Sequence, residues 1–232
     1  MKSIMKKSVA GVIAIGLLFT SCDAIKNANN TQKGGAIGAT GGAVVGGVIG
    51  NNVGDGDNTA LGAIIGGVVG GAAGAYIGNR MDKQAKQIEN EVPGAEVTRV
   101  GEGINVTFDE NSGVYFATEK YNINEKSKAT LDKLINIFKE YPNTNVLVEG
   151  HTDNTGSESY NMTLSKNRAE AVTNYLTSHN LAPGRFTTKW YGETQPKYDN
   201  STVEGRSKNR RVELAIVANE ELKEEAKKQS QN

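Results

Sequence analysis

The second half of the chain predicts an α+β domain with the element order β-α-β-α-β-β, a mixed sheet with two main helices on one face. Two observations predict it. Apolar residues recur at helical spacing over 124–141 and over 157–180. Shorter apolar runs, continuous or alternating, flank these two segments. Helices and strands that alternate along a chain in this way favour a sheet covered by helices.

The first elements follow from where the apolar residues fall. A short strand is expected at 114–116, ahead of the first helix. The apolar face of that helix consists of Leu131, Leu134, Ile135 and Phe138. Pro142 ends the helix, and the run 146–148 that follows is apolar throughout, as in a central strand.

The later elements are predicted in the same way. The second helix ends before Pro183. A strand is expected at 186–191, and a short helix or turn at 206–211. Apolar residues alternate over 212–216, which indicates a final strand.

The boundaries of the domain come from its flanks. Residues 95–108 alternate like two strands around a turn centred on Glu102, so they are assigned to the domain. The domain is therefore placed at 95–219. Residues 220–232 are polar and rich in charge, and we expect a solvated, partly disordered tail.

The N-terminus has the pattern of a secretory signal. Lysines precede an apolar run at 9–19, which is too short to span a bilayer. Cys22, the only cysteine, directly follows this region in the position of a bacterial lipobox. Residues 1–21 are predicted to be a lipoprotein signal peptide, with the lipid attached at Cys22 and an acylated linker at 22–33. An ordinary signal followed by an incidental cysteine is the alternative.

Residues 34–78 hold 17 of the 28 glycines. In two segments a glycine recurs every four residues, at 34, 38, 42, 46 and 50 and again at 62, 66, 70, 74 and 78. Each glycine in a water-exposed helix costs about 1 kcal/mol, whereas small residues allow helices to approach closely in lipid. We predict a glycine-zipper helical hairpin in the membrane at 34–78 and a polar helix or linker at 79–94. A flexible glycine-rich spacer is the alternative.

Composition excludes several classes of function. The 26 basic and 26 acidic residues balance, so nothing draws the chain toward nucleic acid. Two histidines and one cysteine are too few for a convincing metal site, and we expect no cofactor. No Gly-x-Ser-x-Gly elbow accompanies the serines near His151, which argues against an enzyme.

Asp153 and Arg168 are the candidate binding pair. Asp153 is expected on the loop that leaves the central strand, and Arg168 on the helix that follows. A carboxylate beside a guanidinium can be an ordinary ion pair. The two groups can also receive a zwitterion, whose ammonium meets Asp153 while its carboxylate is held by the fork of Arg168.

Several blocks around this pair resemble the C-terminal domain of the OmpA family, shared with peptidoglycan-associated lipoproteins and flagellar stator proteins. They are Gly150-His-Thr-Asp153, Gly156, Asn161, Leu164-Ser165, Arg168-Ala169, Glu204-Gly-Arg206 and Asn209-Arg-Arg-Val-Glu213. The resemblance implies non-covalent binding of the diaminopimelate residue in the peptide stem of peptidoglycan. By position in these blocks, the site is Asp153, Arg168, Thr152, Asn161, Leu164 and Arg210. Ala117 departs from the family, which often has Asp there.

These expectations combine into a non-enzymatic lipoprotein of the outer membrane of a Gram-negative-type bacterium. Its domain would lie in the periplasm and anchor the membrane to peptidoglycan. Its contacts with the bilayer would be acylated Cys22 and residues 34–78. The alternative is a membrane-inserted glycine-zipper homo-oligomer, a pore or stator-like component that uses the domain only as a tether.

Overall fold

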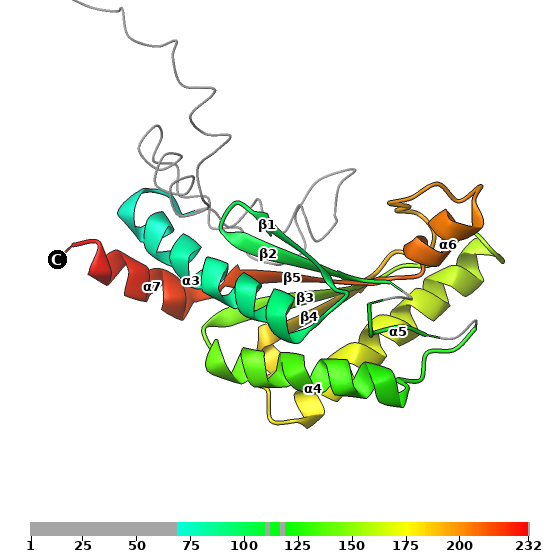
Figure 1. Cartoon of the computed structure of the whole chain (residues 1–232), viewed down its shortest axis with the longest axis horizontal. Coiled ribbons are helices and arrows are strands. Elements are labelled where there is room, and N and C mark those ends of the chain that lie inside the picture. The colour runs from blue at the N-terminus through cyan, green and yellow to red at the C-terminus, as the bar shows by residue number, and fades with distance from the viewer. Residues whose placement is uncertain (1–68, 110–111, 117–118, 232) are drawn as a thin grey trace, which may run out of the picture.

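The structure is a computed structural model that describes residues 69–109, 112–116 and 119–231. Its strands are β1 (Glu96–Val100), β2 (Gly103–Phe108), β3 (Thr144–Gly150), β4 (Phe186–Trp190) and β5 (Val212–Ala218). Its helices are α3 (Gly71–Glu91), α4 (Glu125–Glu140), α5 (Glu158–Ser178), α6 (Val203–Asn209) and α7 (Glu220–Gln229), with a 3-10 turn η1 at Pro183–Arg185. Figure 1 shows their arrangement around one sheet.

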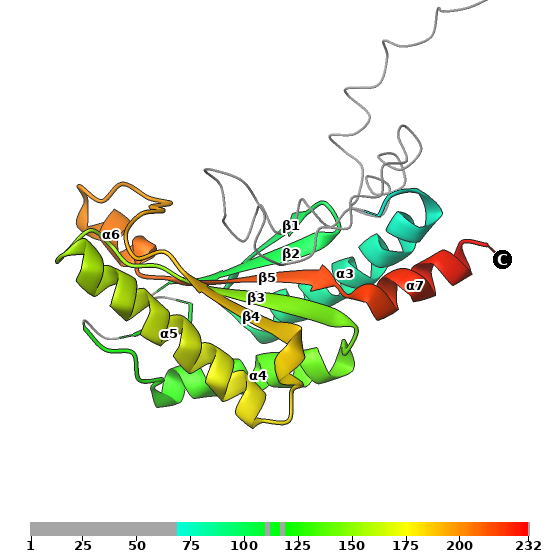
Figure 2. The ribbon, with the colours of Figure 1, turned by 180° about the vertical axis from the view of Figure 1, so that it is seen from behind.

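The five strands form one mixed sheet in the order β1-β2-β5-β3-β4. Only β3 and β4 are parallel, and the other neighbours are antiparallel. Alternate residues of β2, β3 and β5 join side chains of α3, α4 and α5 in one hydrophobic core. Figure 2 shows α5 running along β3 and β4 on this helical side. The α+β class and the mixed sheet are thus confirmed.

The order β-α-β-α-β-β also holds, but its first strand is not the predicted one. Residues 114–116 form no strand, and β2 takes that place. The reason lies in the hydrogen bonds of Tyr115. Its N–H donates to Ser127 Oγ (3.2 Å), and its carbonyl accepts from Asn124 Nδ2 (2.9 Å). Side chains at the start of α4 therefore hold the groups that a neighbouring strand would need.

The predicted boundary between residues 78 and 79 is wrong. One helix, α3, runs through it without a break. Ile77, Met81 and Ile88 lie on one buried face and belong to the core. Gly74 and Gly78, which the sequence assigns to a glycine stripe packed against the other helix of the hairpin, are buried within the domain's first helix. The rest of the predicted hairpin, and Cys22, lie outside the described residues.

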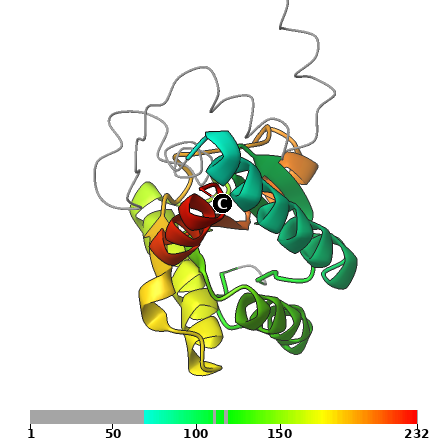
Figure 3. The same cartoon turned by 90° about the vertical axis from the view of Figure 1, so that its left-hand side faces the viewer.

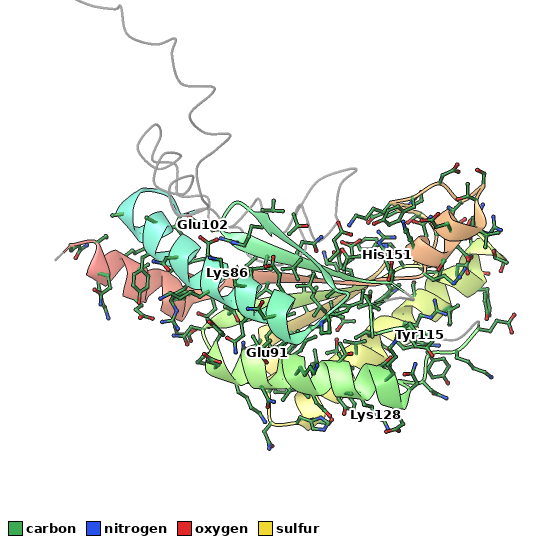
Figure 4. The ribbon with its side chains drawn as sticks, viewed as in Figure 1. Lys86, Glu91, Glu102, Tyr115, Lys128 and His151 are labelled. Carbon is green, nitrogen blue, oxygen red and sulfur yellow. The ribbon has the colours of Figure 1, made fainter. Side chains whose placement is uncertain are left out.

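Glu102 fixes the point at which the chain enters α3. Its carboxylate accepts from the backbone N–H groups of Val69 (2.8 Å) and Gly70 (3.0 Å). Helix N-termini have unpaired N–H groups and a partial positive charge, so a carboxylate is a suitable cap. Figure 4 shows Glu102 beside the first turn of this helix. The β1–β2 turn therefore clamps the end of the glycine-rich region to the domain.

The polar tail is ordered, contrary to prediction. Residues 220–229 form α7, which Asn219 caps by accepting from the Leu222 N–H (3.0 Å). Leu222 and Ala226 are buried in the core, and the Tyr76 hydroxyl donates to Glu225 (2.6 Å). Helices α3 and α7 lie side by side in Figures 1 and 3. Across residues 69–109, 112–116 and 119–231, none of the helices is both long and apolar enough to cross a bilayer.

Candidate functional site

Two glycines let α5 approach the ends of β3 and β4. A Cβ on Gly150 would lie 2.2 Å from the Ser165 carbonyl oxygen, closer than any real contact. Gly192 has a φ of 55°, and a Cβ there would lie 3.0 Å from the Met162 nitrogen. Gly192 also accepts from Thr152 N–H (2.8 Å). The loop that leaves β3 is therefore pressed against the first turns of α5.

Asn161 holds that loop in place. Its side-chain amide donates to the carbonyls of Asp153 (3.3 Å) and Thr155 (3.1 Å), and to the Glu193 carboxylate (2.5 Å). Ser157 caps α5 just before it, by accepting from the Tyr160 N–H. Asn161 thus positions the loop, and a contact between Asn161 and a ligand stays a prediction.

The loop, α5 and α6 enclose a pocket of about 200 Å³. All six residues that the sequence nominates for ligand binding line it. Among the described residues, those that line it are Glu119, Thr152, Asp153, Thr155, Gly156, Tyr160, Asn161, Leu164, Arg168, Arg206 and Arg210. Residues as far apart in the sequence as Glu119 and Arg210 therefore meet at one place, at the end of the sheet where β3 finishes.

Asp153 is 5% exposed and is already engaged. One carboxylate oxygen accepts from the Thr155 N–H (2.9 Å), and the other pairs with Arg210 Nη1 (2.5 Å). A carboxylate offers about four acceptor positions, so this pairing leaves room for another donor. The carboxylate that the sequence places beside Arg168 is thus paired with Arg210, and Arg168 lines the same pocket.

Arg168 is 2% exposed and is among the largest fully buried side chains. Its Nε donates to the Lys120 carbonyl (3.0 Å), and its guanidinium lies over the Phe116 ring, 5.3 Å from the centroid. A planar guanidinium stacks well on an aromatic face. The side chain is thus fixed in one orientation at the pocket wall before any ligand arrives.

The side chains that line the pocket carry more positive than negative charge. Within the described part of the chain, three guanidinium groups and two carboxylates, those of Glu119 and Asp153, line it. The hydroxyl oxygen of Thr152 is buried in the same wall, and it has no hydrogen-bond partner among the residues that the structure describes. Charge and hydrogen-bonding capacity both suit a small ligand that carries carboxylates.

Behind the pocket, the opposite face of the sheet holds a buried polar cluster. Arg211 pairs with Glu213 (2.5 Å), so it faces away from the site. The pKa of His151 falls to about 3, because burial and the nearby Arg211 disfavour its charged form. His151 is therefore neutral, stacks on Tyr191 and makes no ion pair with Glu149 at 3.9 Å. Figure 4 marks His151 at this end of the sheet.

The sequence did not nominate Glu119 or Tyr160 for the pocket, and it grouped Arg206 with Arg210 and Arg211 as a cluster that could include one ligand contact. Arg206 belongs to the Glu204-Gly-Arg206 block, so that block carried a signal for it. Glu119 belongs to none of the blocks, so the sequence carried no signal for it. It stands in a loop, where its φ is 59°. Ala117, the departure from the family pattern, lies outside the described residues.

The fold and the pocket together define an OmpA-like domain. Residues 115–210 match the model described as OmpA family, and residues 5–82 match the one described as YMGG-like Gly-zipper. A peptidoglycan-associated lipoprotein of Pasteurella multocida is 39% identical over 102 residues, which are 44% of this chain and 68% of that protein. The chain belongs to the OmpA family.

Two further comparisons extend this result. Probable lipoprotein YiaD of Escherichia coli is 33% identical over 140 residues, which are 60% of this chain and 64% of that protein. The cell wall anchor of the T6SS from Pseudomonas aeruginosa has a similar structure, with a TM-score of 0.51, 28% identity and coverage of 60% of this chain and 97% of that one. The chain spans between 33% and 64% of the length of three curated relatives.

Proposed function

We propose that this protein anchors a bacterial membrane to the cell wall by binding the peptide stem of peptidoglycan at its diaminopimelate residue. One observation carries the proposal. Asp153 and Arg168, both almost fully buried, line a single small pocket. Opposite charges at fixed positions suit a ligand group that has an ammonium and a carboxylate on the same carbon.

In this proposal the ligand's ammonium meets Asp153 and its carboxylate meets Arg168. The ammonium shares the Asp153 carboxylate with Arg210 and the Thr155 N–H. Arg168 is held by Lys120 and Phe116, so little side-chain entropy is lost when it binds. Thr152 supplies a hydroxyl to the same ligand, and Leu164 supplies an apolar contact.

The volume of the pocket limits what enters it. At about 30 Å³ for each water, 200 Å³ corresponds to six or seven water molecules. That space suits the charged end of one amino-acid side chain better than a whole disaccharide. The glycan strand therefore lies outside, and recognition takes place at the peptide.

The envelope role rests on the N-terminal pattern and on two relatives. Cys22 stands at a lipobox position, and relatives are named a peptidoglycan-associated lipoprotein and a probable lipoprotein. We propose that acylated Cys22 inserts into the inner leaflet of the outer membrane and that the domain acts in the periplasm. The protein has no catalytic role in this account and needs no cofactor.

The alternative, a glycine-zipper pore, loses support from α3. A hairpin across a bilayer needs two arms of about 20 residues each. Because α3 takes up residues 71–78, only 62–70 are left for the second arm. Even as a helix, that segment would extend only about 14 Å.

Co-sedimentation of the full chain with purified diaminopimelate-type sacculi tests the proposal. The wild-type protein should sediment with the sacculi. Asp153→Ala and Arg168→Ala should each weaken the free energy of binding by about 2–5 kcal/mol. Glu89→Ala and Arg80→Ala on α3, away from the pocket, are the matched controls and should bind normally. Unchanged circular dichroism would verify folding. Sedimentation of both pocket variants at the wild-type level would reject the site.

A further inference from the structure

We propose that Arg206 forms a second anion position in the pocket and binds a second carboxylate of the same stem peptide. The proposal deepens the proposed function and rests on it. It predicts that the protein distinguishes a stem with a free second carboxylate from one in which that carboxylate is amidated.

Arg206 differs from the two arginines that follow it in the chain. Arg210 pairs with Asp153, and Arg211 pairs with Glu213. Arg206 lines the pocket, yet within residues 69–109, 112–116 and 119–231 it has no carboxylate partner. Its guanidinium is therefore a pocket charge that the domain itself does not neutralise.

The backbone orients this guanidinium from one side. Nη1 donates to the carbonyls of Asn200 (2.9 Å) and Ser201 (3.3 Å). Neither Nε nor Nη2 donates to a described residue. A guanidinium presents five donors in a rigid fork, so the edge that is not used can receive a carboxylate.

The loop that supplies those carbonyls is itself fixed against α6. Asn209 donates to the Tyr198 carbonyl (2.7 Å) and to Asn200 Oδ1 (2.8 Å). Gly205 permits this contact, since a Cβ there would lie 1.9 Å from the Asp199 carbonyl oxygen. Arg206 is thus held by a rigid support, which reduces the entropy that binding would cost.

Charge balance indicates the chemistry of the ligand. The pocket carries three guanidinium groups against the carboxylates of Glu119 and Asp153. A ligand group with one ammonium and one carboxylate adds no net charge, so one positive charge remains. A second carboxylate neutralises it. Stem peptides carry such carboxylates next to the diamino acid, and amidation removes the charge with little change in shape.

Calorimetric titration of the full chain with two synthetic diaminopimelate stem peptides tests the inference. One peptide has its second carboxylate free, and the other has it amidated. Wild type should bind the free form about tenfold more tightly. Arg206→Gln should bind both forms alike, at about the affinity of wild type for the amidated form. Lys208→Gln, on the same helix but outside the pocket lining, should behave as wild type.

Each result decides one claim. Equal binding of the two peptides by wild type, or full discrimination by Arg206→Gln, would overturn the role of Arg206 alone. An absence of binding to either peptide would overturn the proposed function, and the inference with it. Arg206→Lys, which keeps the charge but loses the fork, should discriminate only in part and guards against a folding defect in the glutamine variant.

Discussion

Asp153 and Arg210 form a 2.5 Å ion pair across 57 positions of the sequence. The pair joins the loop after β3 to the residue that ends α6, so it closes one side of the pocket. Asp153 is buried, and a buried carboxylate without a partner would be costly. Arg210 therefore pairs with Asp153 and holds its carboxylate in place for the ligand's ammonium.

Gly150→Ala should destabilise the domain and weaken binding together. The new methyl group would collide with the Ser165 carbonyl oxygen and push α5 away from β3. We expect a loss of about 1–3 kcal/mol in the free energy of unfolding, measured by urea denaturation. Gly184→Ala is the control, because a Cβ there meets nothing within 4 Å. Equal stability of the two variants would refute the close approach.

Glu102→Gln should loosen the start of α3. The substitution removes the negative charge and one of the two oxygens that accept from Val69 and Gly70. A lost helix cap costs about 0.5–2 kcal/mol, and these two amide protons should exchange faster with solvent. Glu89→Gln, at an exposed position on the same helix, should leave the exchange rates unchanged. Unchanged amide exchange rates at Val69 and Gly70 in Glu102→Gln would show that Glu102 does not hold the start of α3.

Leu222→Ala should lower stability by about 2–5 kcal/mol, because the side chain is 1% exposed and its loss leaves a cavity beside α3. Lys228→Ala, at an exposed position of α7, is the control. Urea denaturation measures both. A change of less than about 0.5 kcal/mol for Leu222→Ala would contradict the packing of α7 against the core and would favour a solvated tail.

Stability should decline as the pH falls below about 6.5. Burial lowers the pKa of His151 to about 3, whereas an unfolded histidine has a pKa near 6.5. Between these pH values the unfolded chain binds a proton that the folded protein does not. The free energy of unfolding therefore falls by up to about 1.4 kcal/mol for each unit by which the pH is lowered. His151→Phe should flatten this slope between pH 6.5 and 4.5. An identical slope in wild type and variant would contradict the assignment.

Most of the sheet and its two main helices could be predicted because apolar periodicity decides them. Leu131, Leu134 and Phe138 are spaced for one helical face and do form it. Periodicity failed at 114–116, where Val114 and Phe116 are buried although the segment is a loop. Alternating apolar residues indicate which side of an extended segment is buried. It does not report whether a neighbouring strand supplies hydrogen bonds, and Ser127 and Asn124 supply them here.

The boundaries of α3 and α7 could not be predicted, because tertiary contacts decide them. Gly74 and Gly78 continue a glycine pattern, yet Ile77 and Met81 on the same helix belong to the core of the domain. The segment 220–229 is strongly polar, and only Leu222 and Ala226 face inward. Two small contacts on a charged helix give no clear periodic signal.

The candidate site shows the same division. The motif placed Asp153 and Arg168 near each other, because a strand, a short loop and a helix fix their geometry. The ion pair between Asp153 and Arg210 depends on how β5 and α6 pack, which spacing along the chain does not encode. Glu119 reaches the pocket from a loop, where the sequence contains no periodic pattern at all.

The most direct test of the central claim compares two stem peptides, one with diaminopimelate and one with lysine at the same position, by calorimetric titration of the full chain. Lysine has the ammonium for Asp153 but lacks the carboxylate for Arg168. Loss of that charge-assisted contact should weaken binding by about 2–5 kcal/mol. Arg168→Ala should remove the difference between the peptides. Equal affinity of the wild-type protein for both peptides would contradict the account.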